Sequence, residues 1–235
     1  MVCVKESIWT RQQKAAPARE TLTREQIVRT ALEALDAEGL AGLSIRKLAA
    51  KLGSGATSLY WHVPTKDDLI DLLIDEVWGE IDIPGPELAG WRSGLLLFAH
   101  SMRSVILRHP WLPEVMYTRP SQGPNAMTMG TRGLALIDAA GITGRNADFA
   151  LGTVMSFVLG NTGAEVATRE LARRGGQSLD ELVAEVRDRT ETIADPIMRE
   201  SARRRTTGDI DGMFYDSFNY GLEIVLEGIA ARVKA

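Results

Sequence analysis

Cysteine occurs only once in the 235 residues, at Cys3. A single thiol excludes a disulfide within the chain and any metal site built from several cysteines. Long apolar runs are also missing: stretches such as 94–99 fall far short of the roughly 20 residues that a membrane-spanning helix needs. The first residues lack the apolar stretch of a signal peptide, so we expect a cytoplasmic protein with no membrane partner.

Recognisable catalytic patterns are absent too. The sequence contains no glycine-rich phosphate loop, no nucleophile elbow and no His/Glu set with the spacing of metal ligands. What is present is an ordinary globular composition, with 45% hydrophobic and 25% charged residues. We therefore expect no enzymatic activity and no cofactor, although turnover of a bound small molecule would restore an enzyme as an alternative.

Charge is distributed unevenly along the chain. Residues 1–66 carry ten Lys and Arg against six Asp and Glu, a net charge of +4, and the remaining residues carry 17 against 25, a net charge of −8. A basic N-terminal part on an acidic body is typical of a protein whose N-terminal part meets a polyanion. Random variation of surface charge is the alternative, and the charge count alone leaves it open.

Helical periodicity predicts four short helices in the first third of the chain. Thr23 followed by Gln26 forms a capping box for the first helix, and Gly39 is a typical terminator. Ser44 and Gly53 repeat this pattern of cap and stop for the second helix.

The third and fourth helices follow after short breaks. We place the second helix at 45–52 and the third at 56–62, separated by a turn, which is the layout of a helix–turn–helix motif. Pro64 ends the third helix and Thr65 caps the fourth. No alternation of apolar and polar residues indicates a strand, so we predict an all-α fold.

The remainder of the chain is also predicted to be helical. A stretch rich in Pro and Gly at 81–87 is interpreted as a linker. Beyond it, the apolar period predicts helices near 88–108, 124–140, 146–173, 178–188 and 209–233. The charged residues 189–208 carry no clear period, so the pattern assigns them no structure. The second part is therefore expected to form a helical bundle.

The segment "GATSLYWHVPTK" gives the third helix an unusual outer face. Leu59 and Val63 lie four residues apart and are expected to point inward. The side chains left at the edge or facing outward are those of Thr57, Ser58, Tyr60, Trp61 and His62. Hydroxyl and imidazole groups can bond base edges or phosphates, and aromatic faces can contact thymine methyl groups or sugars.

Cations flank this outer face. Arg46 and Lys47 belong to the preceding helix, and Lys66 lies at the start of the next one, where backbone N–H groups also favour a phosphate. In a helix–turn–helix the second helix enters the major groove, so the pattern predicts a DNA-binding surface. The alternative is that Tyr60 and Trp61 are core aromatics that cap a small domain.

A family resemblance supports the DNA-binding interpretation. "GLSIRKLAAKLGSGATSLYWHVPTKDDLID" resembles the DNA-binding domain of the tetracycline-repressor (TetR) family, and residues 59–69 are especially similar to the tetracycline repressors themselves. The C-terminal half resembles the family's ligand and dimer domain more loosely. That likeness rests on "YTRPS" and on "SFNYGLEIVLEGIAARV" at 217–233.

The resemblance implies a domain plan and a DNA contact set. Residues 1–20 would be a flexible arm, 21–66 a three-helix helix–turn–helix domain, and 67–235 a helical domain for ligand binding and dimerisation, with a linker near 80–87. The expected DNA-binding residues are Arg46, Thr57, Ser58, Tyr60, Trp61, His62 and Lys66. Ala56 stands where the repressors have a glutamine. Because alanine cannot make a bidentate contact to adenine, the operator sequence should differ.

The resemblance also implies a dimer that reads a palindrome and is released by a small effector. The dimer would form through the helices near 146–173 and 209–233, where a purely intramolecular core is the alternative. Apolar and thioether side chains that suit an adaptable pocket are Phe98, Met102, Trp111, Met116, Met127, Met129, Phe149, Met155 and Phe157. Plain core packing is the alternative for each of them.

A metal-bound effector is not expected. Tetracycline repressors bind a magnesium–drug chelate, but their ligand histidine aligns with Val115 and their drug-binding asparagine falls near Phe98. We therefore expect a largely apolar effector and no metal. His100 and His109 are interpreted as surface or hydrogen-bonded structural histidines rather than ligands.

Two other DNA-binding functions stay open at the level of sequence. An architectural DNA-binding protein would share the helix–turn–helix but lack an inducer, and hydrophobic compounds would not raise its melting temperature. An activator would share both domains with a repressor, because the position of the operator decides between them.

Overall fold

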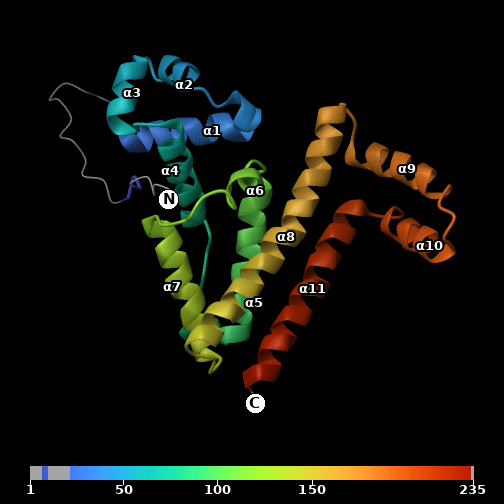
Figure 1. Ribbon diagram of the computed structural model, residues 1–235. Helices are drawn as coiled ribbons and strands as arrows, with labels where there is room; N and C mark the ends of the chain where they lie inside the picture. The colour runs from blue at the N-terminus through green and yellow to red at the C-terminus, as the bar shows by residue number, and fades with distance from the viewer. Residues whose placement is uncertain (1–6, 10–21, 234–235) are drawn as a thin grey trace, which may run out of the picture.

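The computed structural model describes residues 7–9 and 22–233, and the chain is all-α over these ranges. Its helices are α1 (Arg24–Gly42), α2 (Ile45–Lys51), α3 (Ala56–His62), α4 (Lys66–Gly79), α5 (Pro86–Arg108), α6 (Leu112–Val115), α7 (Pro124–Ala139), α8 (Arg145–Gly175), α9 (Leu179–Thr190), α10 (Pro196–Arg205) and α11 (Ile210–Val233). Figure 1 shows α1–α3 gathered at one end as a head, and α4 running from it into a body of α5–α11.

Local sequence signals build the head as expected. The Thr23 hydroxyl accepts from the backbone N–H of Gln26, and the Gln26 side chain accepts from the N–H of Thr23, so the capping box is confirmed. Gly39 breaks α1 by adopting a φ of 68°, a left-handed conformation that glycine tolerates without strain. The last residues of α1 therefore continue in a new direction toward α2.

The N-cap residues of α2 and α4 differ in whether their hydroxyl groups make a capping hydrogen bond. Ser44 occupies the N-cap position of α2, but its hydroxyl makes no cap hydrogen bond. The short α2 is instead anchored by Leu48 and Ala49, which are buried. Thr65 does cap α4, because its hydroxyl accepts from the backbone N–H of Asp68 at 3.0 Å.

The body is organised around the 31-residue helix α8, which packs against α5, α7 and α11. Helix α5 in turn packs against α7. Helix α10 occupies part of the stretch to which the sequence pattern assigned no structure. Asp195 caps α10 and Pro196 occupies its first turn, yet none of its residues is buried. Because α10 has no inward apolar stripe, periodicity could not reveal it.

The segments at the two ends of the head are more firmly packed than the sequence suggests. Within the predicted arm at 1–20, residues 1–6 and 10–20 lie outside the described ranges, but Ile8 is buried and Trp9 packs against the core. The predicted linker is likewise anchored, since Ile81 and Ile83 are both buried. In the part of the chain described, no helix is long and apolar enough to cross a membrane.

A buried carboxylate fixes α4 to α7. The Asp75 side chain accepts from the backbone N–H groups of Asn125 at 3.2 Å and Ala126 at 2.9 Å, in the first turn of α7. The Asn125 amide donates back to the carbonyl of Asp75 at 3.0 Å. The positive end of the α7 dipole also favours a carboxylate at this place.

We expect Asp75→Asn to lower the free energy of unfolding by about 1–3 kcal/mol, because an amide NH₂ would face a buried N–H donor. Urea denaturation followed by circular dichroism measures the change. Glu76→Gln on the exposed side of the same helix is the matched control. Equal unfolding free energies for the two variants would contradict the role of Asp75.

Candidate nucleic-acid interface

Helix α3 presents an inner apolar face and an outer aromatic face. Leu59 and Val63 are each 1% exposed, whereas Tyr60 is 48% and Trp61 54% exposed. This exposure excludes the alternative in which Trp61 is a core aromatic. Arg24 donates from Nη2 to the carbonyl of His62 at 3.3 Å, which ties the end of α3 to the start of α1.

The other predicted DNA-binding residues surround this outer face. Thr57 and Lys66 are exposed, Ser58 and His62 are half-buried, and Arg46 is exposed on α2. Lys47 is engaged instead by Glu38, at 3.1 Å within the head. The structure therefore brings the predicted residues together on the surface made by α2, α3 and the start of α4, with the aromatic pair on α3.

Comparison with known proteins identifies the family. The domain family described as "Tetracyclin repressor-like, C-terminal domain" matches residues 83–233, which is more than half of the chain. The family described as "Bacterial regulatory proteins, tetR family" matches residues 27–73. The chain belongs to the TetR family.

Known relatives agree with this assignment. An HTH-type transcriptional regulator of Saccharopolyspora erythraea is 40% identical over 173 residues, which cover 73% of each chain. The HTH-type transcriptional repressor DrrR1 of Streptomyces coeruleorubidus is 34% identical over 97% of this chain and 85% of its own. Among solved structures, the TetR-family protein ActR of Streptomyces coelicolor in complex with actinorhodin has a TM-score of 0.77 at 30% identity, covering 92% of this chain and 100% of ActR.

The predicted pocket residues of this TetR-family body fall into two groups. Phe98, Met102, Trp111, Met116 and Met129 are buried, and Met155 and Phe157 are half-buried. Met127 and Phe149 are instead exposed, at 63% and 62%. Both lie off the buried stripes of α7 and α8, so they do not join the interior of the single chain. Residue type suggested a pocket role, but the rotational phase of each helix decides which residues face inward.

The histidines lie outside any ligand cluster. Among residues 7–9 and 22–233, no group of three His, Cys, Asp or Glu side chains is arranged to hold a metal ion. His109 is 2% exposed and bonded to Asp36 and Glu80, so its interpretation as a satisfied structural histidine is confirmed. His100 lies beside Phe218 and Tyr215, where burial and the Arg103 charge lower its pKa.

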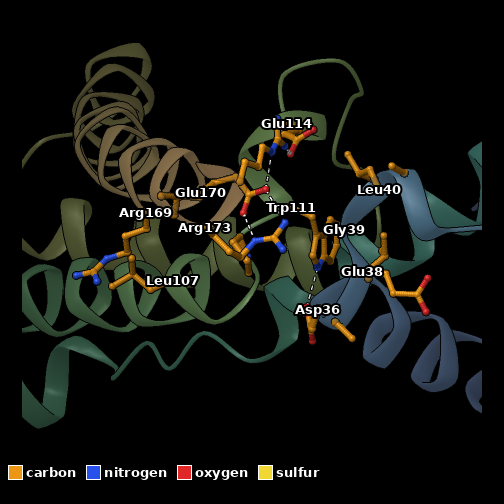
Figure 2. A pocket seen from close by; sticks show the side chains of 16 residues that line it. Asp36, Glu38, Gly39, Leu40, Leu107, Trp111, Glu114, Arg169, Glu170 and Arg173 are labelled. Atoms are coloured by element: carbon orange, nitrogen blue, oxygen red, sulfur yellow. Dashed lines mark hydrogen bonds and ion pairs between the residues drawn. The ribbon is translucent and has the colours of Figure 1, made fainter. Parts of the chain in front are cut away.

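A cleft of about 510 Å³ lies between the head and the body, and no pattern in the sequence predicts it. Figure 2 shows Trp111 and the C-terminal end of α1 on one side and the arginines of α8 on the other. Arg173 and Arg174 both donate to Glu170, and these hydrogen bonds lower the pKa of Glu170 to about 2. Tertiary packing assembles this cleft, because its α1 and α8 segments are more than 100 residues apart in sequence.

We expect Lys66→Ala to weaken binding to all DNA sequences and to flatten the slope of log K against log salt by about one unit, because one phosphate contact is lost. Fluorescence anisotropy across a salt series measures both effects. Arg132→Ala, which removes an exposed cation from α7 in the body, should leave the slope unchanged. An unchanged slope for Lys66→Ala would place the DNA surface elsewhere.

Proposed function

We propose that this chain is a cytoplasmic, ligand-responsive transcriptional repressor that binds a palindromic operator as a dimer and is released by a largely apolar effector. The observation that carries the proposal is the outer face of α3. An aromatic pair, the Thr57 hydroxyl and two cations stand exposed above two buried anchors, Leu59 and Val63, in a helix–turn–helix. Together with membership of the TetR family, this face supports a transcriptional regulator rather than an enzyme.

The helix–turn–helix geometry predicts how the head would bind DNA. Helix α3 would lie in the major groove, where Thr57 and Ser58 at its N-terminal end meet base edges. Trp61, with 54% of its surface free, would contact a sugar or a thymine methyl group. Arg46 and Lys66 would neutralise phosphates on either side. Ala56 leaves the adenine contact of the tetracycline repressors unmade, which predicts a different operator.

Dimerisation is supported by apolar side chains that the single chain leaves uncovered on α8 and α11. Phe149 on α8 is 62% exposed, and Tyr220 and Ile224 on α11 are 74% and 55% exposed. Gly152 and Gly160 of α8 have open space where a Cβ would lie, which permits close approach of another helix. A twofold pair through these helices would place two heads on one palindrome, about 34–36 Å apart.

An effector-binding body is supported by likeness to ActR, which was solved in complex with actinorhodin. In this chain Phe98 and Val115 are buried apolar residues where the tetracycline repressors have polar ligands. Met102 and Met116 offer flexible thioethers beside them. These residues favour a largely apolar effector that needs no metal.

Release would pass through α4, because that helix touches both parts of the molecule. Arg119 in the loop after α6 bonds Asp67 at 2.6 Å and Asp71 at 3.0 Å on α4, while Asp75 holds α7. Burial raises the pKa of Asp71. An effector that shifts α7 or this loop would therefore pull α4 and the head. A complete switch requires about 10⁴-fold tighter effector binding to the released state.

Selection of DNA from a random pool by the purified protein tests the function. A palindrome with half-sites one helical turn apart is the expected result. Selection of no sequence would contradict a specific regulator and favour an architectural protein. Thermal melting with a panel of hydrophobic aromatic compounds, with and without a magnesium chelator, separates the two in parallel. A rise in melting temperature that survives the chelator supports the apolar effector.

We expect Ile224→Glu to convert the dimer to a monomer and to weaken operator binding by at least tenfold, because a carboxylate would be buried at the helix interface. Sedimentation equilibrium and anisotropy measure the two effects. Ile197→Glu is the matched control, since Ile197 is 77% exposed on α10. Retention of the dimer by Ile224→Glu would exclude this face of α11.

A further inference from the structure

The cleft between the head and the body is a candidate binding site that neither part contains alone. Its lining comes from the end of α1 at 35–41, from the residues around the end of α5, and from the end of α8 at 166–174 (Figure 2). Its volume of about 510 Å³ falls within the range of about 300–1,000 Å³ that is usual for small-molecule sites. Of the pocket residues predicted from the sequence, Trp111 lines the cleft, whereas Phe98, Met102 and Met116 do not. The cleft is therefore a different site from the effector pocket proposed for the body.

Part of the lining is apolar. Leu40 of α1, Leu107 of α5 and Pro110 are half-buried, so each keeps surface that a bound molecule could cover. Gly39 also lies in the lining, and its φ of 68° turns the end of α1, so that Leu40 follows a new direction beside the cleft. Covering these side chains would remove apolar surface from water. The cleft therefore favours a ligand with an apolar body.

The α8 side of the cleft supplies hydrogen-bond donors. Arg173 donates to Glu170 from Nε at 2.6 Å and from Nη2 at 2.7 Å, and Arg174 donates to the same carboxylate from Nε at 2.6 Å. Two guanidiniums carry ten N–H donors, so within the part of the chain that the structure describes these three bonds leave seven for water or a ligand. One carboxylate thus serves two cations, and this side of the cleft can bind a second carboxylate.

The free donors, rather than the net charge, decide which ligand suits the cleft. The charges of the lining nearly cancel, because three arginines stand against four Asp and Glu residues. The carboxylates on the head side already have partners. Asp36 accepts from the Trp111 indole at 2.8 Å, and Glu38 accepts from Lys47 at 3.1 Å. These two therefore oppose an anion less than carboxylates without partners would.

The remaining charged residues of the lining leave the donors of Arg173 and Arg174 available. Arg169 donates to Glu165 at 2.8 Å and to Asp211 at 2.6 Å, so it is already engaged by two carboxylates. Glu114 lies 3.9 Å from Arg174, which is too long for a hydrogen bond.

We propose that this cleft binds a small molecule with an apolar body and one carboxylate group, which Arg173 and Arg174 hold from α8. The apolar body would lie against Leu40, Leu107 and Pro110. A carboxylate suits the site because the planar guanidinium can bind it through two parallel N–H···O bonds. The ligand of the cleft therefore differs in charge from the largely apolar effector proposed for the body.

A molecule in the cleft would contact the head and the body at once. The residues of α1 belong to the head, which carries α3, and those of α8 belong to the body. A ligand stabilises the state that it binds, so occupancy favours the present spacing of α1 and α8. Binding requires only the folded chain, so the proposal rests neither on DNA binding nor on dimerisation.

Fluorine NMR of the full-length protein labelled with 5-fluorotryptophan tests the site. The chain has five tryptophans, and the signal of Trp111 is identified with Trp111→Phe or by elimination, with the other four replaced in turn. Naphthalene-2-carboxylate is the probe, and naphthalene-2-carboxamide is its uncharged analogue of the same shape. The carboxylate should shift the Trp111 signal and raise the melting temperature. The carboxamide should bind about tenfold more weakly, because it lacks the charge-assisted hydrogen bonds.

Variants on the α8 side of the cleft identify the donors. The double variant Arg173→Gln/Arg174→Gln should weaken carboxylate binding by about tenfold and leave carboxamide binding unchanged. Arg189→Gln/Arg204→Gln is the matched control, since these arginines are 68% and 66% exposed and each is paired with a glutamate four residues earlier on α9 or α10. Glu170→Gln should strengthen carboxylate binding, because it removes the carboxylate that competes for the same donors.

Several results would overturn the proposal. These are an unshifted Trp111 signal with the carboxylate, equal affinity for carboxylate and carboxamide, and tighter binding of the cationic analogue 2-naphthylmethylammonium. Wild-type affinity in Arg173→Gln/Arg174→Gln would place the carboxylate elsewhere and would also overturn it, with circular dichroism confirming that the variant is folded. A shifted Trp111 signal in a protein that binds no operator would uphold the cleft and reject only the function proposed above.

Discussion

The structure depends on α4 being buried on two sides at once. Nine of its 14 residues are buried, including Asp68 and Asp75, so the helix is covered nearly all round. It packs on both α1 and α7, and Asp75 caps the start of α7. A helix covered in this way cannot rotate or slide independently of either part. The head is therefore joined firmly to the body through α4, which begins four residues after α3 ends.

The head could be derived from the sequence because its signals are local. Thr23, Gln26 and Gly39 each act within a few residues, and the four-residue spacing of Leu59 and Val63 fixes which side of α3 faces outward. The outer position of Trp61 then follows without knowledge of the rest of the chain. Ser44 shows the limit of such signals, since its place at the N-cap is right but its hydroxyl makes no bond.

The structure of the body could be predicted only in part from the sequence, because it depends on contacts between segments that are distant in the chain. Helical periodicity located α8, yet Phe149 faces outward because the phase of α8 is set by packing on α5 and α7. Helix α10 buries nothing and so left no apolar period. The partners of His109 are 73 and 29 residues away, and no spacing rule connects them. The cleft beside Trp111 likewise forms only through the packing of distant segments, those of α1 and α8.

Contacts between distant segments also build the joint between the head and the body. The contact between α1 and the end of α5 is polar, because the His109 imidazole lies between the carboxylates of Asp36 and Glu80. The Trp111 indole adds a second hydrogen bond to Asp36, at 2.8 Å. Together with α4, these bonds hold the head against the body. In the proposed dimer, whose two heads would stand one DNA turn apart, this joint would set how α3 is presented to the groove.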